Sequence, residues 1–303
     1  MRFMEMHDGQ LSVTAEMVRD LVGGQFPEYT RLPIEPVHSE GTVNAIFRIG
    51  EQLAARFPLQ PNDVDTTRRW LQDEANAARE LLGRTRVPVP EPVAIGEPGA
   101  GYPAPWSIQT WLPGTTASEV DCSTSDHFAH DLAEFIQQVR SIDVAGRAFT
   151  GDGRGGDLRS HDNWIETCFA ESSRLVDVPQ IRQIWTRLRQ LPRNSPDVMT
   201  HGDLIPGNVL VSEGRLTGIL DVGGLGPTDP ALDLVAAWHL LDTDRRQLLR
   251  DNLGCSDLDW ERGKAWALQQ AMGAIWYYID SNPPMHRMGR RTIEQIIADE
   301  SHT

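Results

Sequence analysis

The sequence of 303 residues has few cysteines, a single lysine and no long apolar run. Its three cysteines, Cys122, Cys168 and Cys255, are far apart and odd in number, which predicts neither a disulfide framework nor a zinc cluster. No segment approaches the roughly 18 consecutive apolar residues of a membrane span. The first residues are too acidic and too interrupted by polar positions for a signal peptide. We therefore expect a cytoplasmic protein without a membrane partner.

Positive charge is also scarce. The chain has 28 Lys and Arg against 43 Asp and Glu, a net charge of −15. A phosphate backbone requires a basic face, so we do not expect nucleic acid as a partner. A negative surface attracts cations, which favours a cationic small molecule as the partner. The alternative is an acidic surface that only maintains solubility. The oligomeric state cannot be inferred.

What is present predicts a globular α+β protein. Apolar residues make up 40% of the chain, which is enough for a sizeable core and excludes global disorder. The hydrophobic pattern divides the chain into a small β-rich lobe, 1–112, and a larger, mainly helical lobe, 113–303. In the first lobe we predict helices at 14–22 and 66–82 and strands at 31–37, 45–49, 53–57 and 106–111. In the second we predict a loop at 148–161, strands at 209–212 and 216–220, and helices at 126–139, 181–191, 231–241, 244–252, 260–279 and 291–298.

The segment from His201 to Asn208 contains the most informative pattern. Asp203 is followed five residues later by Asn208, and Asp221 comes directly after an apolar strand. Phosphoryl transfer to a hydroxyl needs a carboxylate that orients the hydroxyl and oxygen ligands that hold Mg²⁺. Asp203 would orient the hydroxyl and accept its proton, Asn208 and Asp221 would hold the metal, and His201 would support the loop. The alternative is a polar turn with incidental acids.

This pattern resembles the aminoglycoside phosphotransferase family of the protein-kinase-like superfamily. The resemblance rests on HGDLIPGN at 201–208, DVG at 221–223 and GPTDPALDL at 226–234. Ile205 and Val222 depart from the residues that many members carry there, but neither position should ligate metal. The resemblance implies a two-lobe kinase-like fold, ATP or GTP and Mg²⁺ as cofactors, and transfer of the γ-phosphoryl group.

The same resemblance implies an ion pair in the first lobe. Arg56 stands on the third predicted strand, where the family places a cation against the nucleotide phosphates. Glu74 lies on an apolar stripe of the next helix that we expect to include Trp70 and Leu81, and a buried carboxylate there needs a charged partner. The alternatives are an exposed arginine, a glutamate at the edge of the stripe, or Glu80 as the partner.

Two further segments of the first lobe would contact the nucleotide. The loop with Gly41 and Thr42 would cover the phosphates, although it lacks the full glycine motif and is a weak signal alone. Gln109, Trp111 and Leu112 would present their backbone to the base.

The second lobe would receive the acceptor. Asp233 is expected to support the catalytic loop rather than to react. Only five residues separate Gly223 from Asp229, which leaves no room for the long activation segment with which protein kinases dock peptides. This favours a small-molecule acceptor.

Four acids border the expected acceptor cleft and would bind its ammonium groups: Asp157, Asp162, Glu166 and Asp280. The acceptor implied is an amine-bearing compound with a hydroxyl, such as an aminoglycoside or macrolide antibiotic, which would make the protein a resistance enzyme. The alternatives are a kinase of an endogenous amino alcohol, sugar or homoserine, and a catalytically silent nucleotide-binding module.

Overall fold

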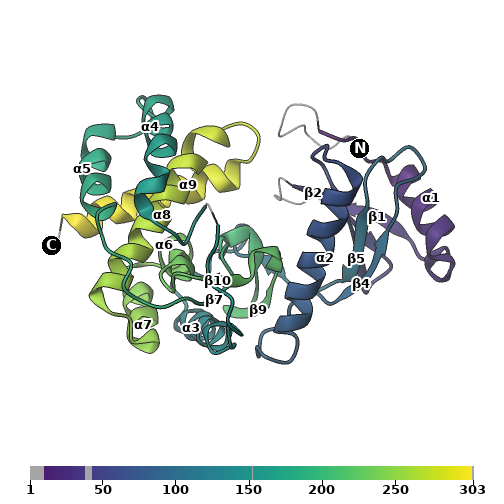
Figure 1. The fold of residues 1–303 in the computed structure, drawn as a ribbon, viewed down its shortest axis with the longest axis horizontal. Helices are drawn as coiled ribbons and strands as arrows, with labels where there is room; N and C mark the ends of the chain where they lie inside the picture. The colour runs from purple at the N-terminus through teal and green to yellow at the C-terminus, as the bar shows by residue number, and fades with distance from the viewer. Residues whose placement is uncertain (1–9, 38–42, 152, 302–303) are drawn as a thin grey trace. The chain divides into compact units, whose positions relative to one another are not determined.

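The chain folds into two units in the computed structural model, which describes residues 10–37, 43–151 and 153–301 (Figure 1). The first unit comprises the described residues up to 82 together with 88–113. The second comprises 83–87 and the described residues from 114 onward. Among the residues that the structure describes, no helix is both long and apolar enough to cross a membrane.

The first unit is an antiparallel sheet with strand order β1-β2-β3-β5-β4 and two helices. The strands are β1 (Ile34–Val37), β2 (Asn44–Ile49), β3 (Leu53–Pro58), β4 (Pro92–Gly96) and β5 (Trp106–Thr110). The helices are α1 (Ala15–Gln25) and α2 (Val64–Leu81). The side chain of Thr14 caps α1 and that of Asp63 caps α2, each by accepting a backbone N–H of the first turn.

Side chains of β3 alternate between two faces of this sheet, as the pleat of a strand requires. Phe57 belongs to a buried cluster with Leu21 of α1 and Trp106 of β5, and its ring stacks on that of Trp106 at 4.9 Å between centroids. Arg56 lies on the opposite face and pairs with Glu74 of α2. The two helices therefore cover opposite faces of the sheet.

The second unit is mainly helical and carries two small sheets. Its helices are α3 (Asp126–Arg140), α4 (Asp162–Glu171), α5 (Val178–Leu188), α6 (Val235–Leu240), α7 (Thr243–Leu253), α8 (Asp257–Tyr277) and α9 (Pro283–Glu300). One sheet has the order β6-β8-β9, formed by Thr115–Thr116, Val209–Ser212 and Arg215–Ile219. The other pairs β7 (Val198–Thr200) with β10 (Gly226–Thr228).

Helix α8 lies at the centre of the second unit. It packs against α4, α5, α6 and α9, and most of its residues between Trp260 and Ile275 are buried (Figure 1). The single lysine of the chain, Lys264, is buried on this helix and pairs with Glu261, Asp299 and Glu300 at 2.7–2.9 Å. Three carboxylates thus compensate one buried ammonium, which explains why a lysine is tolerated in this core.

Some local predictions were wrong. The first helix, predicted to end at residue 22, continues to Gln25, and β4 and α4 were missed. The predicted helix at 231–241 begins only at Val235, after a 3-10 turn at Leu232–Leu234. Trp70 was placed on the buried stripe of α2 but is 56% exposed. The buried face instead contains Leu71, Ala75 and Ala78, a spacing of three to four residues that leaves Trp70 outside.

Candidate active site

The segment between β7 and β8 forms the core of the site. After Thr200 the chain turns through Gly202, with φ of +83°, and enters β8 by a short 3-10 turn that ends at Asn208. The backbone N–H of Leu220, at the end of β9, donates to the carbonyl of Asn208 at 2.8 Å. Asn208 therefore lies directly before β8 and Asp221 shortly after the end of β9, and the pairing of these strand ends brings the two residues close to each other.

Both carboxylate oxygens of Asp203 accept hydrogen bonds. Asn208 Nδ2 donates to Oδ2 and to the backbone carbonyl of Asp203, each at 3.0 Å. Arg154 Nη1 lies 3.1 Å from Oδ1 of the same carboxylate. The two side chains of this ion pair are about one-third exposed, so the pair is accessible to a small molecule.

Two buried side chains, those of Asp233 and His201, hold the loop that carries Asp203 in place. Asp233 is fully buried and accepts the backbone N–H groups of His201 and Gly202, both at 2.9 Å. The backbone N–H of Asp203 donates to His201 Nδ1 at 3.3 Å, so the proton of the neutral ring lies on Nε2, which donates to the carbonyl of Leu220 at 3.1 Å. His201 thus connects the loop that carries Asp203 to the strand end that precedes Asp221.

The loop also approaches the segment after Asp221 closely. A Cβ atom at Gly224 would lie 2.9 Å from the carbonyl oxygen of His201, closer than side chains normally come. Because Gly224 has no side chain, the segment that follows β7 and the segment that precedes β10 can lie side by side. Asp221 itself has φ of +54°, a left-handed conformation that Asp adopts more readily than most residues.

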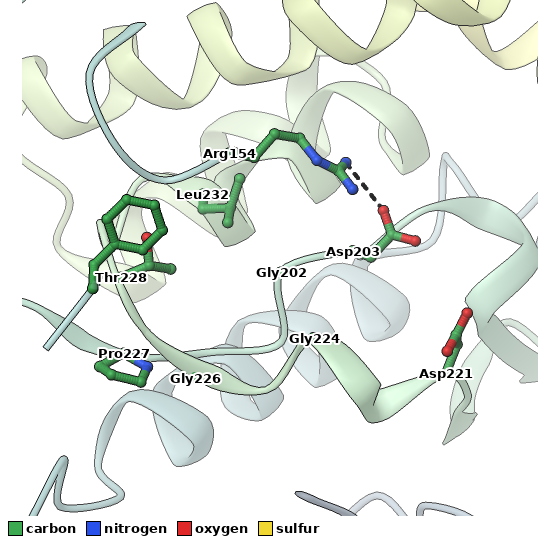
Figure 2. A pocket seen from close by; sticks show the side chains of 10 residues that line it. Arg154, Gly202, Asp203, Asp221, Gly224, Gly226, Pro227, Thr228 and Leu232 are labelled. Atoms are coloured by element: carbon green, nitrogen blue, oxygen red, sulfur yellow. Dashed lines mark hydrogen bonds and ion pairs between the residues drawn. The ribbon is translucent and has the colours of Figure 1, made fainter. Parts of the chain in front are cut away.

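A cavity of about 380 Å³ opens beside these residues within the second unit. Its polar lining includes Arg154, Asp203, Asp221 and Thr228, and its apolar lining includes Phe149 and Leu232. Figure 2 shows the guanidinium of Arg154 reaching toward Asp203, with Asp221 carried by the neighbouring strand end. The cavity can therefore hold a small molecule against the carboxylate of Asp203.

The donor set fits a magnesium ion that also has ligands from a bound nucleotide. Among the described residues no cluster of three or more His, Cys, Asp or Glu could form a metal site on its own. Mg²⁺ commonly binds one or two protein oxygens together with phosphates and water. Because Nδ2 of Asn208 donates its N–H groups to Asp203, Oδ1 of Asn208 is the atom that would ligate the ion, and the carboxylate of Asp221 would provide the second protein ligand.

In the first unit the predicted ion pair is present. Arg56 is buried, with 7% of its surface exposed, and its Nη1 donates to Glu74 Oε1. Gly41 and Thr42 lie outside the described residues. Gln109 lies on β5 and Leu112 just beyond it. The backbone N–H of Trp111 donates to the carbonyl of Gln52 at 2.7 Å, so this donor is engaged within the unit.

The four acids predicted to bind the acceptor are not gathered in the cavity, since none is among its described lining residues. Asp157 caps a 3-10 turn and pairs with Arg159. Asp162 accepts from the guanidinium of Arg189 and the indole of Trp185, and Glu166 pairs with Arg182. Asp280 is exposed beyond the end of α8. An ammonium group would therefore compete with arginines at three of the four positions.

Arg154 is the site residue that the sequence analysis missed. It lies in the predicted loop 148–161, beside Gly155 and Gly156. A long cationic side chain between glycines was the available signal, but that loop also contains Arg159. The choice between the two arginines depends on contacts with β10 and α8, which are distant in sequence.

Comparison with known proteins identifies the class to which this site belongs. The model of the phosphotransferase enzyme family matches residues 29–266. An aminoglycoside 3'-phosphotransferase of Escherichia coli is 31% identical over 143 residues, which cover 45% of this chain and 52% of that protein. Another, of Streptomyces fradiae, is 32% identical over 184 residues, covering 54% and 63%. The alignments thus span about half to two thirds of these relatives.

Solved structures agree in fold. The GDP complex of wild-type aminoglycoside 2'-phosphotransferase-IIIa has a TM-score of 0.68 at 19% identity and covers 95% of this chain and 100% of that one. A macrolide 2'-phosphotransferase of Brachybacterium faecium has a TM-score of 0.59 at 17% identity and covers 91% and 98%. The predicted kinase-like α+β fold is confirmed. With a family model that spans most of it, the chain belongs to the phosphotransferase enzyme family.

Proposed function

We propose that the protein is a small-molecule kinase that transfers the γ-phosphoryl group of ATP or GTP to a hydroxyl of an antibiotic of the aminoglycoside or macrolide class. The observation that carries this proposal is the placement of Asp203 in a cavity, braced by Asn208 and close to the strand end that bears Asp221. The relatives named above support the antibiotic class, because they phosphorylate aminoglycosides or macrolides by name.

The proposed mechanism assigns the residues of the site distinct roles. Asp203 accepts a hydrogen bond from the acceptor hydroxyl, aims its oxygen at the γ-phosphorus and receives its proton. Asn208 and Asp221 hold Mg²⁺, which when bound neutralises charge on the phosphates. Arg56, oriented by Glu74, contacts the phosphates through a planar array of donors. Gly41, Thr42, Gln109, Trp111 and Leu112 remain proposed nucleotide contacts.

The acceptor is proposed to be amine-bearing, as the net charge of −15 suggests. Asp157, Asp162, Glu166 and Asp280 remain candidates for binding its ammonium groups outside the described cavity. If exposed charges hold the acceptor, its affinity should fall as salt rises. An affinity that ignores salt, or a preference for neutral acceptors, would contradict this part of the proposal alone.

The test is nucleotide consumption with a panel of aminoglycosides, macrolides, amino alcohols, sugars and homoserine, each with ATP and with GTP. We expect turnover with an antibiotic. Asp203→Asn should retain nucleotide affinity and lose turnover by roughly 10²–10⁴-fold, the usual contribution of a general base. Asp221→Ala should lose the dependence on Mg²⁺ together with turnover.

The remaining outcomes separate the alternatives. Turnover confined to an endogenous amino alcohol, sugar or homoserine would favour a housekeeping kinase. Nucleotide binding by calorimetry without any turnover would favour a silent binding module. Wild-type turnover in Asp203→Asn would exclude the catalytic role proposed for this carboxylate.

A further inference from the structure

We propose that Arg154 is a positioning residue that occupies the reactive oxygen of Asp203 until an acceptor displaces it, and so suppresses transfer of the phosphoryl group to water. This inference rests on the proposed function. It assigns a role to a side chain that neither the family motifs nor the sequence pattern identifies.

Arg154 occupies the oxygen of Asp203 that faces the cavity. Asn208 Nδ2 donates to Oδ2, and Asn208 is not among the described residues that line the cavity. Arg154 Nη1 lies 3.1 Å from Oδ1, and both Arg154 and Asp203 line the cavity. Oδ1 is therefore the oxygen that a molecule in the cavity would approach, and the guanidinium occupies it (Figure 2).

The backbone that directly follows Arg154 is firmly held. Thr228 Oγ1 donates to the carbonyl of Gly155 at 3.0 Å. Arg262 Nη2 donates to the carbonyl of Gly156 at 3.2 Å, and this arginine forms an ion pair with Asp229 in which both side chains are at most 2% exposed. A buried ion pair of this kind breaks only at high cost. The base of the Arg154 side chain therefore has a fixed position.

The guanidinium of Arg154, in contrast, can move. The Arg154 side chain is 35% exposed, and its contact with Asp203 is a single hydrogen-bonded ion pair rather than a bidentate one. Partly exposed ion pairs contribute about 1 kcal/mol or less. A bound acceptor can offset that loss with its own contacts, whereas one water molecule has few other contacts with which to do so.

The chemical consequence concerns acceptor-free hydrolysis of the nucleotide. In that reaction the oxygen of water bonds to the γ-phosphorus and the bond to the β–γ bridging oxygen breaks. The nucleoside diphosphate leaves with the electron pair, and the proton of water passes to Asp203. With Arg154 on Oδ1, water is not oriented for this attack. An acceptor that displaces the guanidinium makes Oδ1 available to its hydroxyl.

The experiment measures ATP and GTP hydrolysis without acceptor in the wild type and in Arg154→Ala, Arg154→Gln and Arg154→Lys. We expect Ala and Gln to raise the rate about fivefold, the change that loss of a partly exposed ion pair gives. Lys, which keeps the charge but not the planar fork, should lie between them and the wild type. Melting temperatures show whether each variant folds, and Arg159→Ala, which removes an exposed arginine of the neighbouring turn, serves as the control.

Two further measurements test whether the gain in hydrolysis acts through Asp203 or through the binding of nucleotide. The double variant Arg154→Ala with Asp203→Asn should lose the gain, because the gain acts through Asp203. The affinity for ATP and GTP, measured by calorimetry, should be the same in Arg154→Ala and the wild type. A large loss of nucleotide affinity would instead make Arg154 a phosphate ligand and overturn the proposal.

Unchanged or slower hydrolysis in folded Arg154→Ala and Arg154→Gln would also overturn the inference. So would a gain that persists in the double variant. These failures leave the proposed function intact, provided that the wild type still phosphorylates an acceptor. Failure of the proposed function looks different, because no acceptor would then be phosphorylated and Asp203→Asn would hydrolyse nucleotide as the wild type does.

Discussion

Asn208 donates its side-chain amide to two oxygens of Asp203, the backbone carbonyl and Oδ2, each at 3.0 Å. The amide therefore orients the proposed base while its own Oδ1 is available to a cation. If residue 208 only bound the cation, a carboxylate could replace the amide. Orienting Asp203 in addition requires a hydrogen-bond donor, which a carboxylate lacks. The two roles of Asn208 can be separated by substitution.

Asn208→Asp keeps an oxygen for Mg²⁺ but replaces the donor with a negative charge beside Asp203. We expect turnover to fall by roughly 10²-fold or more, because the base loses its orientation. Asn208→Ala should lose as much and should also need more Mg²⁺. The measurement is kcat as a function of Mg²⁺ concentration, with Asn194→Asp, an exposed asparagine in the loop before β7, as the control. Near-normal kcat in Asn208→Asp would show that the hydrogen bond to Asp203 is dispensable.

The ion pair of Arg56 with Glu74 gives a second prediction. Arg56→Ala should weaken nucleotide binding by about 10- to 100-fold, the range expected for charge-assisted hydrogen bonds. Arg56→Lys should recover part of this loss, because the charge remains while the planar fork is lost. Calorimetry with ATP and GTP provides the measurement, and the exposed Arg79→Ala on α2 is the control. Equal affinities in wild type and Arg56→Ala would place the phosphate contact elsewhere.

The sequence predicted those parts of the fold and site whose signals are local. The two strands that lie between Asn208 and Asp221 follow from apolar runs separated by Glu213-Gly214. The cost of burying an unpaired carboxylate on an apolar helix face predicts that Glu74 needs a charged partner, and the resemblance to the family indicated Arg56 as that partner.

Other features depend on contacts that are distant in sequence. Asp229 is buried against Arg262, which lies 33 residues further along the chain. The path of the loop around Arg154 is set by Thr228 and Arg262, 73 and 106 residues from their partners at 155 and 156. No local pattern records such pairings.

A pH-dependent loss of stability is expected from His239. This ring is buried on α6, between Thr292 Oγ1 at 2.9 Å and Gln270 Oε1 at 3.2 Å. Burial lowers the pKa of His239 from 6.5 to about 4, and the nearby positive charge of Arg154 acts in the same direction. The unfolded chain therefore binds a proton more readily than the folded chain between these two values.

The contribution of His239 to stability is present above pH 6.5 and is lost as the pH falls toward 4. From pH 7 to pH 5 the free energy of unfolding should fall by about 2 kcal/mol because of this residue. Urea unfolding of the wild type and of His239→Gln at both pH values provides the measurement. The variant should lose about 2 kcal/mol less than the wild type over this interval. Equal losses would show that His239 is not responsible.

The last prediction compares two glycines that flank Arg154. Gly153 and Gly155 have φ of +126° and +95°, so alanine is strained at both positions. A Cβ at Gly153 would meet nothing within 4 Å, whereas at Gly155 it would lie 1.8 Å from Thr228 Oγ1. Gly153→Ala should therefore lose only the cost of backbone strain, about 1–3 kcal/mol. Gly155→Ala must in addition move the loop away from Thr228.

We expect the free energy of unfolding in urea to fall further in Gly155→Ala than in Gly153→Ala, because only the former also breaks the bond from Thr228 to the carbonyl at 155. The displaced loop should also draw Arg154 away from Asp203, so acceptor-free hydrolysis of nucleotide should rise in folded Gly155→Ala and stay near the wild-type rate in Gly153→Ala. Equal stability and equal hydrolysis in the two variants would mean that the contact with Thr228 does not position Arg154. A loss of stability in Gly155→Ala without a rise in hydrolysis would limit Thr228 to a structural role.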